Sequence, residues 1–107
     1  MTTFDSREKA FEDKFAHDEE IMFKVRARRN RLFGEWVAQT LDMPKAEISA
    51  YVDSVLAADL EDAGDQYVIR KVRADFEKHG VDMSDHRLEK HLEECMSEAK
   101  AQMLTGD

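Results

Sequence analysis

The chain has 107 residues and a formal net charge of −8, because 24 acidic residues outnumber 16 basic ones. A chain of this length forms one domain and buries roughly two-thirds of its unfolded surface, so it folds without disulfides. The negative charge disfavours general nucleic-acid binding, which requires a basic surface. The single cysteine, Cys95, excludes an internal disulfide and suits a reducing compartment.

The sequence contains no segment typical of a secretion signal or a membrane span. Its first eight residues, MTTFDSRE, are charged almost from the start, and no apolar run approaches the ~20 residues that cross a bilayer. We therefore expect a cytoplasmic protein that does not insert into a membrane, although it could bind a membrane complex.

The spacing of apolar residues predicts an all-helical fold. Glycine and proline are scarce, and no long stretch alternates apolar and polar residues as a strand does. Helices are predicted over residues 5–42, 44–61, 65–78 and 85–104. Only Gly34 weakens the first of these, by about 1 kcal/mol relative to alanine.

Three residues mark the expected helix ends. Pro44 suits the first position of the second helix, where its missing N–H costs nothing. Gly80 is suited to follow the end of the third helix, and Ser84 to cap the fourth. The apolar face of the second helix comprises Ile48, Tyr51, Val52, Val55, Leu56 and Leu60.

The first helical stretch is too long for the other three to cover. Its 38 positions would extend about 57 Å, whereas the others have roughly 14–20 residues and reach about half as far. The half from residue 21 onward holds the only tryptophan, Trp36. We therefore predict a small four-helix bundle over 21–104 with a long first helix. The part of that helix over 1–20 is predicted to be an arm, mobile or disordered when free, on a monomeric protein.

Charge divides the chain at the same point. Residues 1–20 contain seven acidic and three basic residues, a net charge of −4. Residues 21–31 contain five basic residues and no acidic one, a net charge of +5. The first stretch is thus predicted to have an acidic end and a basic middle.

Three phenylalanines of the arm, Phe4, Phe11 and Phe15, share one helical face at spacings of seven and four. Each would bury ~150–250 Å² if covered. One interpretation is an amphipathic anchor that enters a groove on a partner. The alternative is that the segment folds back on its own bundle.

Five basic residues over 21–31 also allow two interpretations. Arginine forks bind phosphate groups, but the same residues could form a solvated face that neutralises acids elsewhere in the chain. No glycine-rich phosphate loop is present, so a nucleotide site would be of an unusual kind. The members are Lys24, Arg26, Arg28, Arg29 and Arg31, and a smaller basic group is Arg70, Lys71 and Arg73.

Metal binding and catalysis find little support. His91 and Cys95 are four residues apart, a spacing that suits two metal ligands, but no further cysteine or histidine is suitably placed. His17 lies among acids that would favour its protonated form. No motif of nucleophilic or metal-dependent catalysis occurs. We expect no metal and no enzymatic activity.

Several runs of residues resemble a known protein family. The main ones are TTFDSREKAFEDKFAHDEE over 2–20 and FKVRARRNRLFGEW over 23–36, with shorter ones, VLAADLE over 55–61 and VIRKVRAD over 68–75. Together they span nearly the whole chain and closely resemble the zeta subunit of alphaproteobacterial F-type ATP synthases.

The resemblance implies a four-helix inhibitor of the synthase's ATPase activity, similar in role to the mitochondrial inhibitor protein. It implies that the N-terminal region enters an interface between catalytic subunits and blocks rotation in the hydrolytic direction. The implied partners are the alpha and beta subunits of the catalytic head, with the gamma subunit of the central stalk as a further candidate. The protein would then be peripheral to the inner membrane.

Carried onto this sequence, the inhibitory region is residues 1–20. Nucleotide binding is also linked to the family, so ADP or ATP is a candidate ligand, with no other cofactor expected. A second interpretation of the whole protein is accordingly a small helical regulator that senses a nucleotide. Candidate partner-binding residues are Phe4, Asp5, Arg7, Glu8, Phe11, Lys14 and Phe15, and candidate nucleotide-binding residues are Arg26, Arg29, Arg70 and Arg73.

Overall fold

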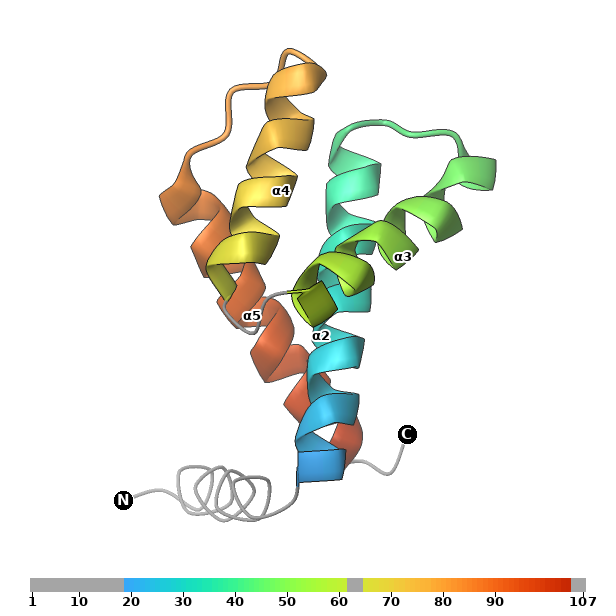
Figure 1. Ribbon diagram of the computed structural model, residues 1–107, viewed down its shortest axis with the longest axis vertical. Helices are drawn as coiled ribbons and strands as arrows, with labels where there is room; N and C mark the ends of the chain where they lie inside the picture. The colour runs from blue at the N-terminus through green and yellow to red at the C-terminus, as the bar shows by residue number, and fades with distance from the viewer. Residues whose placement is uncertain (1–18, 62–64, 105–107) are drawn as a thin grey trace.

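The computed structural model describes residues 19–61 and 65–104. In those ranges the chain forms four α-helices and no strand. The all-α fold with four helices is therefore confirmed. The helices are α2 (Glu19–Thr40), α3 (Lys45–Glu61), α4 (Asp65–Lys78) and α5 (Asp85–Leu104) (Figure 1).

Helix α2 is the centre of the arrangement. It packs extensively against both α3 and α5, while α4 contacts α3 and α5 and has little contact with α2. Figure 1 shows the first turns of α2 and the last turns of α5 together at one end, with α3 and α4 gathered toward the other. Most of the packing between helices therefore involves α2.

The C-terminal end of α4 and the N-terminal end of α5 are capped by the residues that the sequence predicts. Gly80 has a φ of 71°, and the N–H of Val81 donates to the carbonyl of Phe76 at 2.9 Å. This left-handed glycine cap satisfies carbonyls that the helix leaves unpaired. The hydroxyl of Ser84 accepts a hydrogen bond from the N–H of Arg87 at 3.2 Å, which confirms Ser84 as the N-cap of α5.

The end of α2 uses the same kind of cap without a glycine. Asp42 takes a φ of 55°, and the N–H of Met43 donates to the carbonyl of Ala38 at 3.0 Å. Aspartate tolerates this left-handed conformation better than most residues. Pro44 follows, and its ring prevents α2 from continuing. Helix α3 begins at Lys45, one residue later than predicted.

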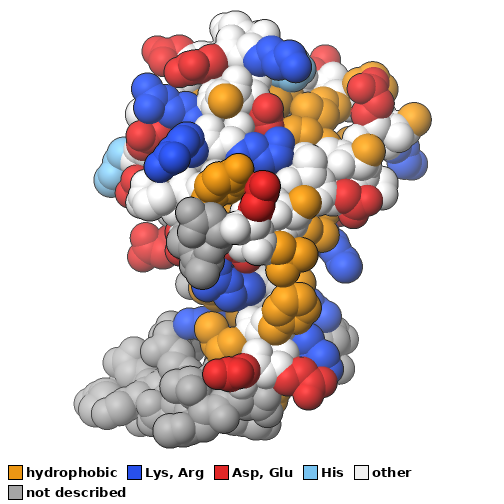
Figure 2. All heavy atoms as spheres, in the orientation of Figure 1, with side chains coloured by type: hydrophobic (Ala, Val, Ile, Leu, Met, Phe, Trp, Pro, Cys, Tyr) orange, Lys and Arg blue, Asp and Glu red, His pale blue; other side chains and the backbone are white. Residues whose placement is uncertain are grey.

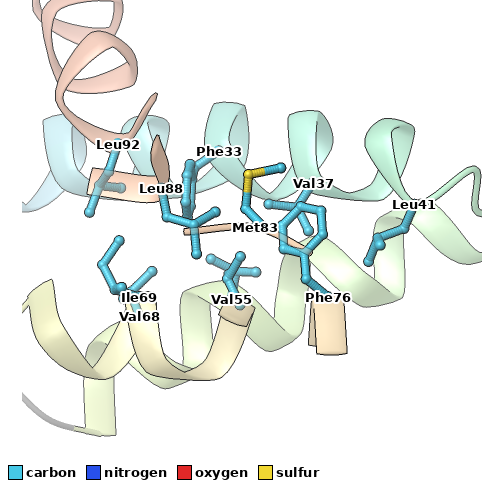
Figure 3. Close-up of a cluster of buried hydrophobic side chains, with 11 residues drawn as sticks. Phe33, Val37, Leu41, Val55, Val68, Ile69, Phe76, Met83, Leu88 and Leu92 are labelled. Carbon is cyan, nitrogen blue, oxygen red and sulfur yellow. The ribbon is translucent and has the colours of Figure 1, made fainter. Parts of the chain in front are cut away.

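The main core draws side chains from all four helices and from Met83 in the α4–α5 connection. A smaller cluster, centred on Val25 and Ala99, joins the start of α2 to the end of α5 and includes Met22 and Met103. The main cluster, drawn in Figure 3, contains Phe33, Val37, Leu41, Val55, Val68, Ile69, Val72, Phe76, Met83, Leu88 and Leu92.

Gly34 allows α2 and α3 to approach closely. A Cβ atom at this position would lie 3.3 Å from both the Cα and a methyl carbon of Val52, and 3.5 Å from a methyl carbon of Val55. The loss of helix propensity at Gly34, anticipated from the sequence, is thus offset by close packing of the two helices.

We predict that Gly34→Leu lowers the free energy of unfolding by about 1–3 kcal/mol, because a large side chain overpacks the contact with α3. The matched control is Ala50→Leu at an exposed position of α3, where the same side chain meets solvent. Urea denaturation followed by circular dichroism measures both. Equal stability of Gly34→Leu and the wild type would contradict the close-packing account.

Candidate functional site

The residues predicted to bind a partner lie outside the described residues, as does His17. The structure therefore describes the bundle to which the predicted arm is attached. Helix α2 begins at Glu19, and its first turns hold the basic segment over 21–31. The undescribed candidates are Phe4, Asp5, Arg7, Glu8, Phe11, Lys14 and Phe15.

Arg29 is a buried cation at the junction of three helices. Only 1% of the residue is exposed. Its Nη1 donates to Oδ1 of Asp65 at 2.9 Å, and its Nε donates to Oδ1 of Asn30 at 3.1 Å. A buried charge is tolerated only when paired and hydrogen-bonded, so these contacts are what make the position of Arg29 possible.

Asp59, near the end of α3, completes the cluster. It accepts a hydrogen bond from Nη2 of Arg26 at 2.8 Å and another from Nδ2 of Asn30 at 2.8 Å. Nη2 of Arg29 lies 3.6 Å from Oδ1 of Asp59. We call these five residues, Arg26, Arg29, Asn30, Asp59 and Asp65, the junction cluster.

The junction cluster shifts the ionisation of its members. Burial alone would raise the pKa of Asp59, but the hydrogen bonds from Arg26 and Asn30 and the charges of Arg26 and Arg29 outweigh burial and hold the pKa below its usual range. The hydrogen bond to Asp59 likewise raises the pKa of Arg26. Asp59 is therefore a carboxylate in the folded protein at neutral pH.

The cluster fastens the end of α3 and the start of α4 onto α2. Asp59 is two residues before the end of α3, and Asp65 is the first residue of α4. Two of the basic residues thus neutralise acids elsewhere in the chain, as one interpretation of the sequence expected. Arg29 does so from a buried position and not from a solvated face.

The four arginines proposed for a nucleotide belong to different networks. Arg26 and Arg29 are in the junction cluster. Arg73 pairs with Glu77 on its own helix and with Asp85 at the start of α5, at 3.5 and 3.4 Å. Arg70 is exposed on α4. A nucleotide site at these residues stays a prediction.

His91 and Cys95 are placed by the core. The ring of His91 stacks on Trp36 with centroids 3.8 Å apart, and its Nδ1 lies 3.6 Å from Oε1 of Glu94. Cys95 packs against the main core, and burial raises the pKa of its thiol to about 11, so the thiol is protonated at neutral pH. Among residues 19–61 and 65–104, no group of three or more histidine, cysteine or acidic side chains could hold a metal ion.

Two large apolar side chains stand out on the surface. Phe23 is 58% exposed and Leu60 is 71% exposed. Leu60 is on the apolar face of its helix but is exposed, because α3 nears its end there and nothing in the described part of the chain covers the side chain. Phe23 is not among the residues predicted to bind a partner, although a phenylalanine outside the apolar face of a helix is a signal for an exposed contact.

Comparison with known proteins decides the family. The family model "ATPase inhibitor subunit zeta" matches residues 1–102. The chain belongs to this family. A protein whose structure was determined by solution NMR is 37% identical, with a TM-score of 0.70, over 81% of this chain and 99% of the other. No curated protein matches.

Family membership confirms the resemblance seen in the sequence and, with it, the assignment to ATPase inhibitors that interact with an ATP synthase. In the part of the chain that the structure describes, no helix is both long and apolar enough to cross a membrane.

The junction cluster makes the stability of the bundle depend on pH. Because the pKa of Asp59 is lower in the folded state, its contribution is present above the unfolded value of about 3.9 and is lost as the pH falls through the folded value. We predict that Asp59→Asn lowers the free energy of unfolding by about 2 kcal/mol at pH 7 and by less at pH 3.

Urea denaturation at the two pH values measures this effect. Asp53→Asn, at an exposed position of the same helix, is the matched control and should change the free energy of unfolding little. An equal loss for Asp59→Asn at pH 3 and pH 7 would show that the charge of Asp59 is unimportant.

Proposed function

We propose that this protein inhibits ATP hydrolysis by F-type ATP synthase through its N-terminal arm, residues 1–20, which inserts at an interface between catalytic subunits. Family membership supports the inhibition. The insertion is our proposal, and it rests on how the arm is joined to the bundle. The protein then acts by binding and not by catalysis.

The proposal rests on the point at which α5 stops covering α2. Met22 and Val25 of α2 pack in the small cluster with Ala99 and Met103 of α5, and α5 ends at Leu104. Among the residues that the structure describes, cover for this face of α2 therefore ends near its first turn. A helical segment before Glu19 would need another partner for its apolar residues.

The spacing of the phenylalanines in the sequence is the one that would continue this face of a helix. Seven residues separate Phe15 from Met22, and another seven separate Met22 from the buried Arg29. Positions seven apart lie on one side of a helix. If the arm is helical when bound, Phe4, Phe11 and Phe15 extend the line of side chains that α5 covers further on. The catalytic subunits would take the place of α5 along the arm.

Inhibition then follows from coupled folding and binding. The arm orders against the alpha and beta subunits and buries its phenylalanines, and ordering the chain costs part of the free energy gained. The bundle is wider than the single helix of the arm and does not enter the interface. It therefore limits how far the arm inserts, and it can contact the gamma subunit. A helix held between subunits that must change shape during catalysis blocks rotation. The protein is thereby peripheral to the membrane, on the cytoplasmic side.

We predict that the double variant Phe11→Ala/Phe15→Ala raises the half-inhibitory concentration by about 100-fold or more. Each phenylalanine contributes about 1.5–3 kcal/mol when buried, and 1.4 kcal/mol corresponds to a tenfold change. ATP hydrolysis by the isolated catalytic head measures the effect. Thermal unfolding of the variant should match the wild type, because the proposal assigns these residues to the arm and the bundle to residues 21–104.

The matched control for this variant is Lys9→Ala/Glu12→Ala. It also replaces two arm residues, keeps the net charge and spares the phenylalanine face. Inhibition by the phenylalanine variant at the wild-type concentration would contradict the anchor mechanism.

A further inference from the structure

An apolar groove lies between α2 and the last turns of α3. Its volume is about 250 Å³, and its apolar lining comprises Phe23, Ala27, Leu56 and Leu60. We call these four residues the docking groove. We propose that it receives an apolar side chain, flanked by carboxylates, from the catalytic head of the ATP synthase. This inference rests on the proposed function and adds a second contact to the arm.

The groove is formed before any partner binds. Arg26, Asn30 and Asp59 also line it, and these three residues are bonded to one another in the junction cluster. Its base is therefore held in place, whereas Phe23 and Leu60 extend into solvent. A preformed apolar site with a fixed polar base is suited to a specific contact, because little ordering is required on binding.

Basic residues beside the groove indicate the chemistry of the partner. Lys24 and Arg31 are exposed on α2, adjacent to Ala27 on the helix surface. Lys24 forms a long, exposed pair with Glu20, at 3.5 Å, which is weak in water. Figure 2 shows hydrophobic side chains together with basic ones along the narrow part of the molecule below its wider body, with acidic ones at the lower end of that part. A partner surface with an apolar side chain and neighbouring carboxylates fits both features.

The position of the groove places it next to the arm. Phe23 is four residues beyond Glu19, which is about 6 Å along a helix. When the arm is inserted at a subunit interface, the docking groove therefore lies at the entrance to that interface. The same catalytic head is then the surface within reach.

The arm itself is a less suitable occupant. Residues 1–33 contain no glycine and no proline to break the helix and turn the arm back. When the arm is inserted as a continuous helix, its phenylalanines are directed away from the groove, because at 100° per residue Ala27 lies about 120° around the helix from Phe15. The observations favour a partner over the arm.

The test is inhibition by the full-length variant Phe23→Gln/Leu60→Gln on the isolated catalytic head. We expect the half-inhibitory concentration to rise about tenfold or more, with thermal unfolding unchanged because both side chains are exposed. Leu60→Gln alone is a second, milder variant and should give a smaller change in the same direction. The control is Ala74→Gln/Ala101→Gln, at exposed positions of α4 and α5, with no effect expected.

Other outcomes would overturn the docking proposal. Unchanged inhibition would exclude the groove as a contact, whatever the arm variants do. Stronger inhibition would show that the groove holds the arm in the free protein. A wild-type dimer in sedimentation that the variant dissociates, with unchanged inhibition, would show that a second copy fills the groove.

The two proposals fail in different ways. If the groove variant weakens inhibition while Phe11→Ala/Phe15→Ala does not, the docking groove stands and insertion of the arm is wrong. If only the arm variant weakens inhibition, insertion of the arm stands and the docking groove is wrong.

Discussion

The structure depends on one buried cation. The guanidinium of Arg29 has almost no contact with solvent, and it pairs with Asp65 at 2.9 Å while Asn30 and Asp59 surround it. Removing one partner of a buried pair destabilises a protein by several kcal/mol, since the remaining charge is left without compensation. These contacts require the end of α3 and the start of α4 to meet at one point on α2. A fold held in this way has little freedom in how its helices are arranged about α2.

This constraint matters for the proposed inhibition because the proposed arm directly precedes α2 in the chain. In the described part of the chain, the cover from α5 ends at the first turns of α2, and the arginines of the junction cluster lie in the following turns. Force on an inserted arm is therefore transmitted to the helix that is most firmly fixed to the rest of the molecule. Three residues of that cluster, Arg26, Asn30 and Asp59, also line the docking groove. A contact at the groove and a contact at the arm would consequently act on one rigid element.

The sequence predicted the helices well where local chemistry determines them. Ser84, Gly80 and Pro44 set helix boundaries through their own backbone preferences, and α4 spans the predicted 65–78. Burial of Arg29 could not be predicted, because its acidic partners, Asp59 and Asp65, are distant in the sequence and arginine is seldom buried. Exposure of Leu60 likewise depends on where neighbouring helices end, which periodicity within one helix does not show. The closeness of Gly34 to Val52 is also a tertiary contact. The arm residues were proposed from their spacing and from the family resemblance.

The most direct test of the account compares two chains on the isolated catalytic head of the ATP synthase. One is the full-length protein, and the other lacks residues 1–18, so that α2 keeps its first residue. Thermal unfolding establishes that the shorter chain retains the bundle. We expect the full-length protein to inhibit ATP hydrolysis and the shorter chain to have lost that inhibition. Equal inhibition by the two chains would contradict the claim that the arm carries the activity.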